Sequence, residues 1–157
     1  MMQTVSIPME QLAQLLEVQL THDGTAQLNV TGMSMWPMLS NRRDFVTLSP
    51  APQICQKGDL ILYRREDGHY VLHRIVRLVS TDEFICSGDN QWLPETVYAR
   101  QVFAIVTAFR RAGKEYLVTH PGYQRYVRTW VAMFPIRRPI LALKNLLLRI
   151  RRKLRAL

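Results

Sequence analysis

The stretch that organises this chain reads Val30-Thr31-Gly32-Met33-Ser34-Met35-Trp36-Pro37-Met38-Leu39. Gly32 tolerates backbone conformations that other residues avoid, while Pro37 fixes its own φ and disfavours helix at the residue before it. The pattern predicts a strand that ends in a stiff loop, with the Ser34 hydroxyl presented at the rim of a β-sheet. Taken alone, the same stretch fits an ordinary strand end that happens to contain a serine.

Three more motifs follow it along the chain. They are Gly58-Asp59 before the apolar run Leu60-Ile61-Leu62, then His73-Arg74-Ile75-Val76, then Gly88-Asp89-Asn90. We call these three the glycine–aspartate motif, the histidine motif and the aspartate–asparagine motif, in that order. We call Gly32–Pro37 the serine motif. In this order they resemble the superfamily of type I signal peptidases and LexA-type serine proteases, most closely the branch in which histidine replaces the lysine base.

The resemblance covers residues 28–108 and implies a fold class. We expect a mainly β (α+β) protein with a signal-peptidase/LexA-like, β-barrel-type catalytic domain over residues 1–119. Apolar spacing and Pro8 predict a short helix over residues 8–20, before the first strand. Alternating apolar residues and turn signals predict the strands; they are expected at 26–30, 44–48, 60–63, 69–79, 84–86, 97–109 and 115–119.

The motifs imply a nucleophile, a base and an orienting acid. A serine hydroxyl needs a neighbouring base, and imidazole suits that task because its pKa lies near the working pH. Ser34, His73 and Asp89 are therefore the expected catalytic residues, with Asp89 bonded to the other ring nitrogen of the imidazole. A mid-strand histidine can also be just a hydrogen-bonded core residue, and Glu95 is the alternative acid. We interpret Asp59 as a structural turn residue.

The oxyanion of the reaction also needs hydrogen-bond donors. In bacterial signal peptidases a serine two residues before the nucleophile contributes one, and this chain has Gly32 there. We expect the Ser34 backbone N–H to act as a donor. Repressor relatives cleave themselves at an Ala-Gly bond, but Ala112-Gly113 follows the motifs and fits an ordinary hairpin turn.

Charge separates the end of the chain from the rest. All 12 acidic residues lie before residue 116, while almost half of the 21 Lys and Arg residues lie after it. Residues 120–157 are predicted to form a basic helical tail with helices over 123–134 and 139–157. The second combines an apolar stripe with many cations and no acid, which favours an anionic membrane surface. Packing on its own domain and pairing with a partner helix remain alternatives, and no nucleic acid is expected.

The resemblance to the signal-peptidase and LexA-type superfamily also implies a function. We expect a serine endopeptidase that cleaves a peptide or leader segment, needs no cofactor or metal, and belongs to a peptide-maturation system. The alternative is a catalytically inactive membrane or partner adaptor on a protease fold. No secretory signal and no run of 18 apolar residues is evident, so a cytoplasmic protein on the inner membrane surface is expected. Cys55 and Cys86 are interpreted as free thiols.

Overall fold

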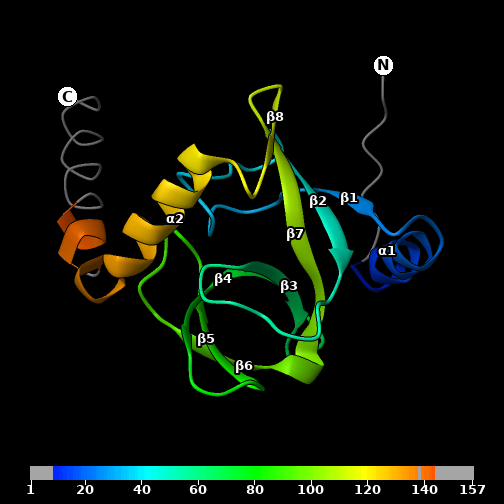
Figure 1. The fold of residues 1–157 in the computed structure, drawn as a ribbon, viewed down its shortest axis with the longest axis horizontal. Coiled ribbons are helices and arrows are strands. Elements are labelled where there is room, and N and C mark those ends of the chain that lie inside the picture. Colours follow the sequence, from blue (N-terminus) through cyan, green and yellow to red (C-terminus); the bar gives the residue numbers. More distant parts are fainter. Residues whose placement is uncertain (1–8, 138, 144–157) are drawn as a thin grey trace, which may run out of the picture.

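The structure is a computed structural model that describes residues 9–137 and 139–143. Eight strands and two longer helices make up most of this part of the chain (Figure 1). The elements are α1 Met9–Asp23, β1 Ala26–Asn29, β2 Phe45–Pro50, β3 Leu60–Arg64, β4 Tyr70–Leu78, β5 Glu83–Ser87, β6 Glu95–Tyr98, η1 Ala99–Gln101, β7 Val102–Arg111, β8 Lys114–Leu117, α2 Pro121–Ala132 and η2 Phe134–Ile136.

The strands form one antiparallel sheet in the order β1-β2-β7-β3-β4-β5-β6. The long strand β7 pairs with β2 along one side, and with β3 and then β8 along the other. The sheet curls on itself, with α1 and α2 at opposite ends of the molecule (Figure 1). The expected mainly β fold with a few helices is therefore confirmed at the level of a curled antiparallel sheet.

The side chains on the two faces of the sheet line two different hydrophobic cores. In β3, Leu60 and Leu62 face a larger core shared with α1 and α2, whereas Ile61 and Tyr63 face a smaller one. Successive residues of a strand point to opposite faces, so one strand serves both cores. The smaller core is built by β3, β4, β5 and β6, and it is the side on which His73 lies.

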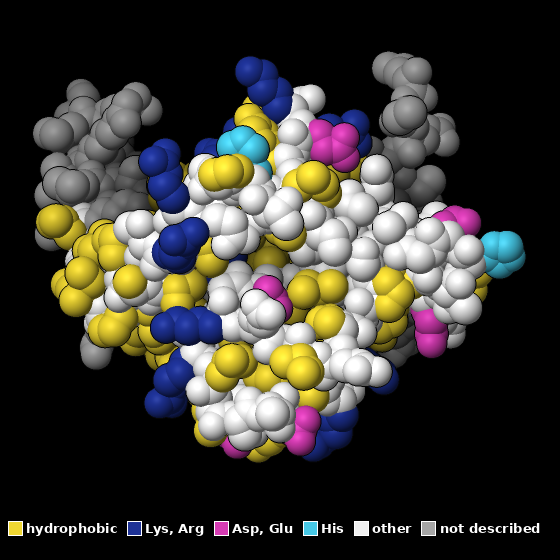
Figure 2. Space-filling view, viewed as in Figure 1, with side chains coloured by type: hydrophobic (Ala, Val, Ile, Leu, Met, Phe, Trp, Pro, Cys, Tyr) yellow, Lys and Arg dark blue, Asp and Glu magenta, His cyan; other side chains and the backbone are white. Residues whose placement is uncertain are grey.

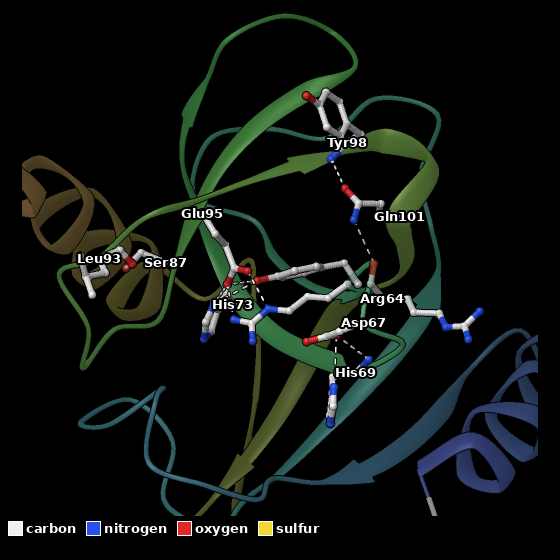
Figure 3. A network of polar contacts seen from close by, with 11 residues as sticks. Arg64, Asp67, His69, His73, Ser87, Leu93, Glu95, Tyr98 and Gln101 are labelled. Atoms are coloured by element: carbon white, nitrogen blue, oxygen red, sulfur yellow. Dashed lines mark hydrogen bonds and ion pairs between the residues drawn. The ribbon is translucent and has the colours of Figure 1, made fainter.

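The predicted strand over residues 97–109 is wrong in one respect, because it is two strands. The 3-10 turn η1 separates β6 from β7, and Gln101 holds it in place. The Gln101 amide accepts a hydrogen bond from the Tyr98 N–H at 2.8 Å and donates one to the Arg64 carbonyl at 3.1 Å (Figure 3). The chain thereby turns from one edge of the sheet into its centre.

Two hairpin turns join neighbouring strands, and Ala112-Gly113 forms one of them, at its predicted position. Residues 65–69 join β3 to β4, with Gly68 at φ 85°. Ala112 and Gly113 join β7 to β8 with φ values of 48° and 82°, as a two-residue hairpin loop requires. Ala112-Gly113 is thus a turn within a paired hairpin.

Helix α2 packs into the larger core, although the catalytic domain was predicted over residues 1–119. Tyr123, Val127 and Val131 of α2 are buried in the larger core. A Cβ on Gly58 would come within 2.7 Å of Val127, so this glycine lets the glycine–aspartate motif approach the helix. Beyond α2, the fully buried Arg137 donates to the carbonyls of Gly88 and Trp130 at 3.2 and 2.7 Å.

The remainder of the predicted tail is described only in part. Residues 139–143 are helical, and Leu141 is buried. Residues 144–157, most of the predicted second helix, lie outside the described residues. Among residues 9–137 and 139–143, no helix combines the length and apolarity needed to cross a membrane.

Candidate active site

Three of the four motifs meet at Arg74. Its guanidinium is completely buried and forms a bidentate pair with Asp89, from Nε to Oδ1 at 2.9 Å and from Nη2 to Oδ2 at 2.8 Å. Its Nη1 donates to the Gly58 carbonyl at 2.9 Å. The histidine, aspartate–asparagine and glycine–aspartate motifs are thereby held together by one side chain.

The serine motif packs against the aspartate–asparagine motif. The Asn90 N–H donates to the Ser34 carbonyl at 2.7 Å, and the Asn90 amide donates to the Met33 carbonyl at 3.1 Å. A Cβ on Gly88 would lie 2.6 Å from the Ser34 carbonyl oxygen, so only glycine permits this approach. Met35 is buried in the larger core and anchors the loop, while Ser34 is half-buried.

His73 lies in β4, buried, on the side of the smaller core. Its Nδ1 is 3.0 Å from Glu95 Oε1 and 3.1 Å from the Tyr63 hydroxyl (Figure 3). Glu95 opens β6, and Tyr63 lies near the end of β3. Strands β3, β4 and β6 of the curled sheet therefore bring a phenol, an imidazole and a carboxylate together.

Glu95 is held from several directions. Arg65 donates to it twice, from Nε to Oε2 at 2.7 Å and from Nη2 to Oε1 at 2.8 Å, and the Tyr63 hydroxyl donates to Oε1. Burial raises the pKa of Glu95, but the hydrogen bonds from His73, Arg65 and Tyr63 outweigh this and hold the pKa well below its usual range. Glu95 is therefore an ionised acceptor at neutral pH.

An ionised Glu95 fixes the tautomer of His73. A carboxylate can only accept hydrogen bonds, so Nδ1 of the neutral ring carries the proton and Nε2 carries the lone pair. Nε2 has no hydrogen-bond partner among the described residues. Only 3% of His73 is exposed, so the ring is almost entirely enclosed. The ring is thus oriented with its basic nitrogen free.

Asp89 does not take the expected place beside His73. Its carboxylate is completely buried and is occupied by Arg74 and by the Tyr126 hydroxyl, at 2.9 Å from Oδ2. The Trp130 indole donates to the Asp89 carbonyl at 3.1 Å. The reason is strand alternation, since Arg74 points to the opposite face of β4 from His73 and takes Asp89 to the α2 side. Of the two acids considered from the sequence, Glu95 is the one that contacts the imidazole.

Among the described residues, Ser34 and His73 are not hydrogen-bonded to each other. Arg74, the residue after His73, pairs in register with Ser87, and Ser87 precedes the Gly88 that touches Ser34. The Ser34 backbone N–H also has no acceptor among the described residues. The hydroxyl and the N–H are therefore both available to a ligand.

Tyr63 and Arg65 were not predicted as site residues, although their spacing from the predicted hairpin places them on the same face as His73. The hairpin fixes the register of β3 and β4, so Ile61 opposes His73 and Tyr63 is its diagonal neighbour on the same face. Arg65 follows Tyr63 by two residues and keeps to that face. Tyr63 buried in the smaller core, with the exposed Arg65 at the edge of that core, marks a polar site.

The remaining candidates are structural. Asp59 accepts a hydrogen bond from the Gln56 N–H at 2.7 Å, as expected of a turn aspartate. Cys55 and Cys86 are free and buried, and burial raises the pKa of both thiols, that of Cys86 to about 12. Within the described residues, no group of three His, Cys, Asp or Glu side chains gathers as a metal site would require.

A scan against protein-family models found no match to this chain, and a search of curated proteins found no similar sequence. What is established is therefore the class of fold, a curled antiparallel sheet with a few helices. The site itself is defined by its side chains: a half-buried serine, and a buried histidine oriented by a carboxylate.

Proposed function

We propose that the protein is a serine endopeptidase of the signal-peptidase and LexA-like type. Ser34 is the nucleophile, His73 the general base and Glu95 the carboxylate that orients His73. The observation that supports this most strongly is the 3.0 Å contact between His73 Nδ1 and Glu95 Oε1 in a largely buried setting. A histidine with a purely structural role in the core needs only a hydrogen-bond partner. The partner of His73 is a carboxylate that is itself held by Tyr63 and Arg65.

The chemistry follows the usual course of acyl transfer. The Ser34 hydroxyl attacks the scissile carbonyl while its proton passes to His73 Nε2, and ionised Glu95 stabilises the imidazolium. Collapse of the tetrahedral adduct breaks the C–N bond, and the imidazolium returns the proton to the leaving amine. Water then attacks the ester on Ser34, again with His73 as base, and releases the second product as a carboxylic acid.

The Ser34 N–H is the proposed donor to the oxyanion. It has no acceptor among the described residues, and it lies in the loop that Asn90 clamps through the Ser34 and Met33 carbonyls. Donors fixed in this way act without reorganising when charge develops, and one such donor contributes about 3–4 kcal/mol in a well-studied protease. The clamp by Asn90 therefore serves to position the donor.

The proposed substrate is a peptide or the leader segment of a peptide precursor. In this proposal the enzyme belongs to a peptide-maturation system and works in the cytoplasm, at the inner membrane surface. The spacing of the apolar residues and the many cations in the sequence of residues 139–157 support membrane attachment, through lipid attraction of about 1 kcal/mol per basic residue. No cofactor is required by this chemistry.

Comparison of peptides in cells tests the proposal. Cells that produce the wild-type chain should accumulate shortened peptides that are missing in cells producing Ser34→Ala. Ser40→Ala is the matched control, because Ser40 lies in the same loop and its hydrogen bonds to the described residues involve only its backbone. Identical peptide profiles for wild type and Ser34→Ala would contradict the proposal.

One observation favours the second candidate, a catalytically inactive adaptor. The Ser34 hydroxyl forms no hydrogen bond to His73 within the described residues. Catalytic hydrogen bonds are often long in free enzymes and tighten only when substrate binds, so this geometry does not decide against catalysis. An adaptor would give the same peptide profile with and without Ser34.

A further inference from the structure

A second concave site lies between α2 and the β7–β8 hairpin, away from the contact between His73 and Glu95. It has a volume of about 500 Å³, within the range of small-molecule pockets. Its walls are aromatic, from Phe109, Tyr116, Tyr123 and Tyr126. The volume and the ring faces suit a flat apolar molecule.

The aromatic walls form one continuous cluster of rings. Tyr116 is stacked on Phe109 with ring centroids 5.5 Å apart, Phe109 lies 5.0 Å from Tyr123, and Tyr123 is stacked with Tyr126 at 6.5 Å. Offset stacks of this kind leave ring faces and edges that attract further aromatic groups. The walls are therefore preorganised before any ligand arrives.

The rim of this cavity is cationic. Arg111 and Lys114 lie at the rim with His120, and no Asp or Glu is among the described residues that line the cavity. Figure 2 shows basic side chains at the tip of the β7–β8 hairpin, at the top of the view, and along α2. The hairpin is held in place because the Ala112 N–H donates to Asp44 Oδ1 at 3.1 Å. An anionic group on the ligand would meet positive charge at a fixed rim.

Side chains that line the cavity contact the Arg74–Asp89 ion pair, which joins the motifs. Arg74 donates to the Tyr123 hydroxyl at 3.0 Å and contacts the Met38 sulfur at 3.8 Å, and the Tyr126 hydroxyl donates to Asp89 at 2.9 Å. Met38, Tyr123 and Tyr126 all line the cavity. A bound molecule would therefore press on side chains that contact Arg74 and Asp89.

We propose that this cavity binds a small aromatic carboxylate, with its ring against the tyrosines and its carboxylate at Arg111 and Lys114. The inference does not depend on the proposed peptidase activity, since it rests on the cavity alone. Binding is expected to be sensed at Trp130, whose indole N–H donates to the Asp89 carbonyl.

Titration of the full chain with 2-naphthoate, followed by nuclear magnetic resonance of amide and indole N–H groups, tests this inference. Saturating shifts are expected at the amides of Ala112, Lys114 and Gly122 and at the Trp130 indole. The double variant Arg111→Glu/Lys114→Glu should bind at least about fivefold more weakly, because a favourable charge becomes repulsive. Arg77→Glu, an exposed strand arginine outside the cavity, is the matched control and should bind as wild type does.

Two probes of the same shape separate anion recognition from simple apolar contact. 2-Naphthol and 2-naphthylmethylamine should shift the same amides only at much higher concentration, and this comparison needs no variant. Equal affinity for all three probes would overturn the proposal. So would unchanged affinity in the double variant, or shifts that map away from the cavity.

Discussion

Glu95 Oε1 lies 3.0 Å from His73 Nδ1 across two strands that are not neighbours in sequence, and Tyr63 contacts both groups. Asp89, the other acid near the motifs, is committed to Arg74 on the opposite side of β4. This division gives the two acids different tasks. Glu95 orients the imidazole, while Asp89 joins the motifs to α2.

The first prediction separates these tasks by activity. Glu95→Gln should lower kcat strongly, because an amide no longer fixes the Nδ1–H tautomer or stabilises the imidazolium; the equivalent change costs about 10⁴-fold in a Ser-His-Asp protease. Steady-state cleavage of a peptide found by the cellular comparison is the measurement. Glu115→Gln, at an exposed position of β8, is the control. A Glu95→Gln variant with at least half the wild-type kcat would remove Glu95 from the mechanism.

The second prediction concerns stability at Asp89. Asp89→Asn leaves the fully buried Arg74 guanidinium without its counter-charge, and breaking one partner of a buried pair costs about 3–5 kcal/mol. Urea unfolding should show a loss of that size in the free energy of unfolding. Asp82→Asn, in the exposed turn before β5, should change it by less than about 0.5 kcal/mol. An Asp89→Asn variant as stable as wild type would show that the pair is not structurally important.

The third prediction concerns how the contribution of Glu95 to the free energy of unfolding depends on pH. Its folded-state pKa is lowered, so its stabilising effect is complete above the unfolded-state pKa of about 4.3 and is lost as pH falls through the folded value. The difference in unfolding free energy between wild type and Glu95→Gln should therefore be largest near neutral pH and shrink below about pH 4. Urea unfolding across this range measures it. A difference that grows as the solution is acidified has the wrong sign and would contradict the depressed pKa.

The fourth prediction concerns the end of the chain. Truncation after Thr119 removes Tyr123, Val127 and Val131 from the larger core and should prevent folding, as judged by circular dichroism. Truncation after Leu143 keeps all of α2 and Arg137 and should fold. If residues 144–157 supply the membrane contact, this second chain should lose the salt-sensitive binding to anionic vesicles that we expect of the full chain.

Two outcomes would contradict that prediction. A folded chain ending at Thr119 would show that α2 is dispensable. Undiminished vesicle binding by the chain ending at Leu143 would place the membrane contact within the described residues instead.

Local patterns predicted most of the strands and both hairpins. Alternating residues and turn chemistry act over short distances, so Gly68 and Ala112-Gly113 are recognisable directly from the sequence. The break between β6 and β7 was missed, because it depends on Gln101 reaching the Arg64 carbonyl from another strand. The membership of α2 in the core was also missed, since a basic amphipathic helix looks alike whether it packs on its own sheet or on another surface.

From the sequence alone, only the site residues that lie within recognisable motifs could be predicted. Ser34 and His73 are visible in the sequence because their neighbours form recognisable motifs. The choice between Asp89 and Glu95 is set by which face of β4 each acid meets, and that depends on the pairing of β4, β5 and β6. Tyr63 and Arg65 become visible only once the β3–β4 register is known.

Rates measured on one peptide with four purified variants test the central claim most directly. Ser34→Ala and His73→Ala should each lower kcat/KM by at least about 10³-fold, because the members of such a unit act together. Ser40→Ala and His69→Ala, the latter at an exposed turn residue that contacts Asp67 (Figure 3), should cleave as wild type does. If Ser34→Ala or His73→Ala, still folded, cleaves the peptide at the wild-type rate, the protein is not a Ser34–His73 peptidase.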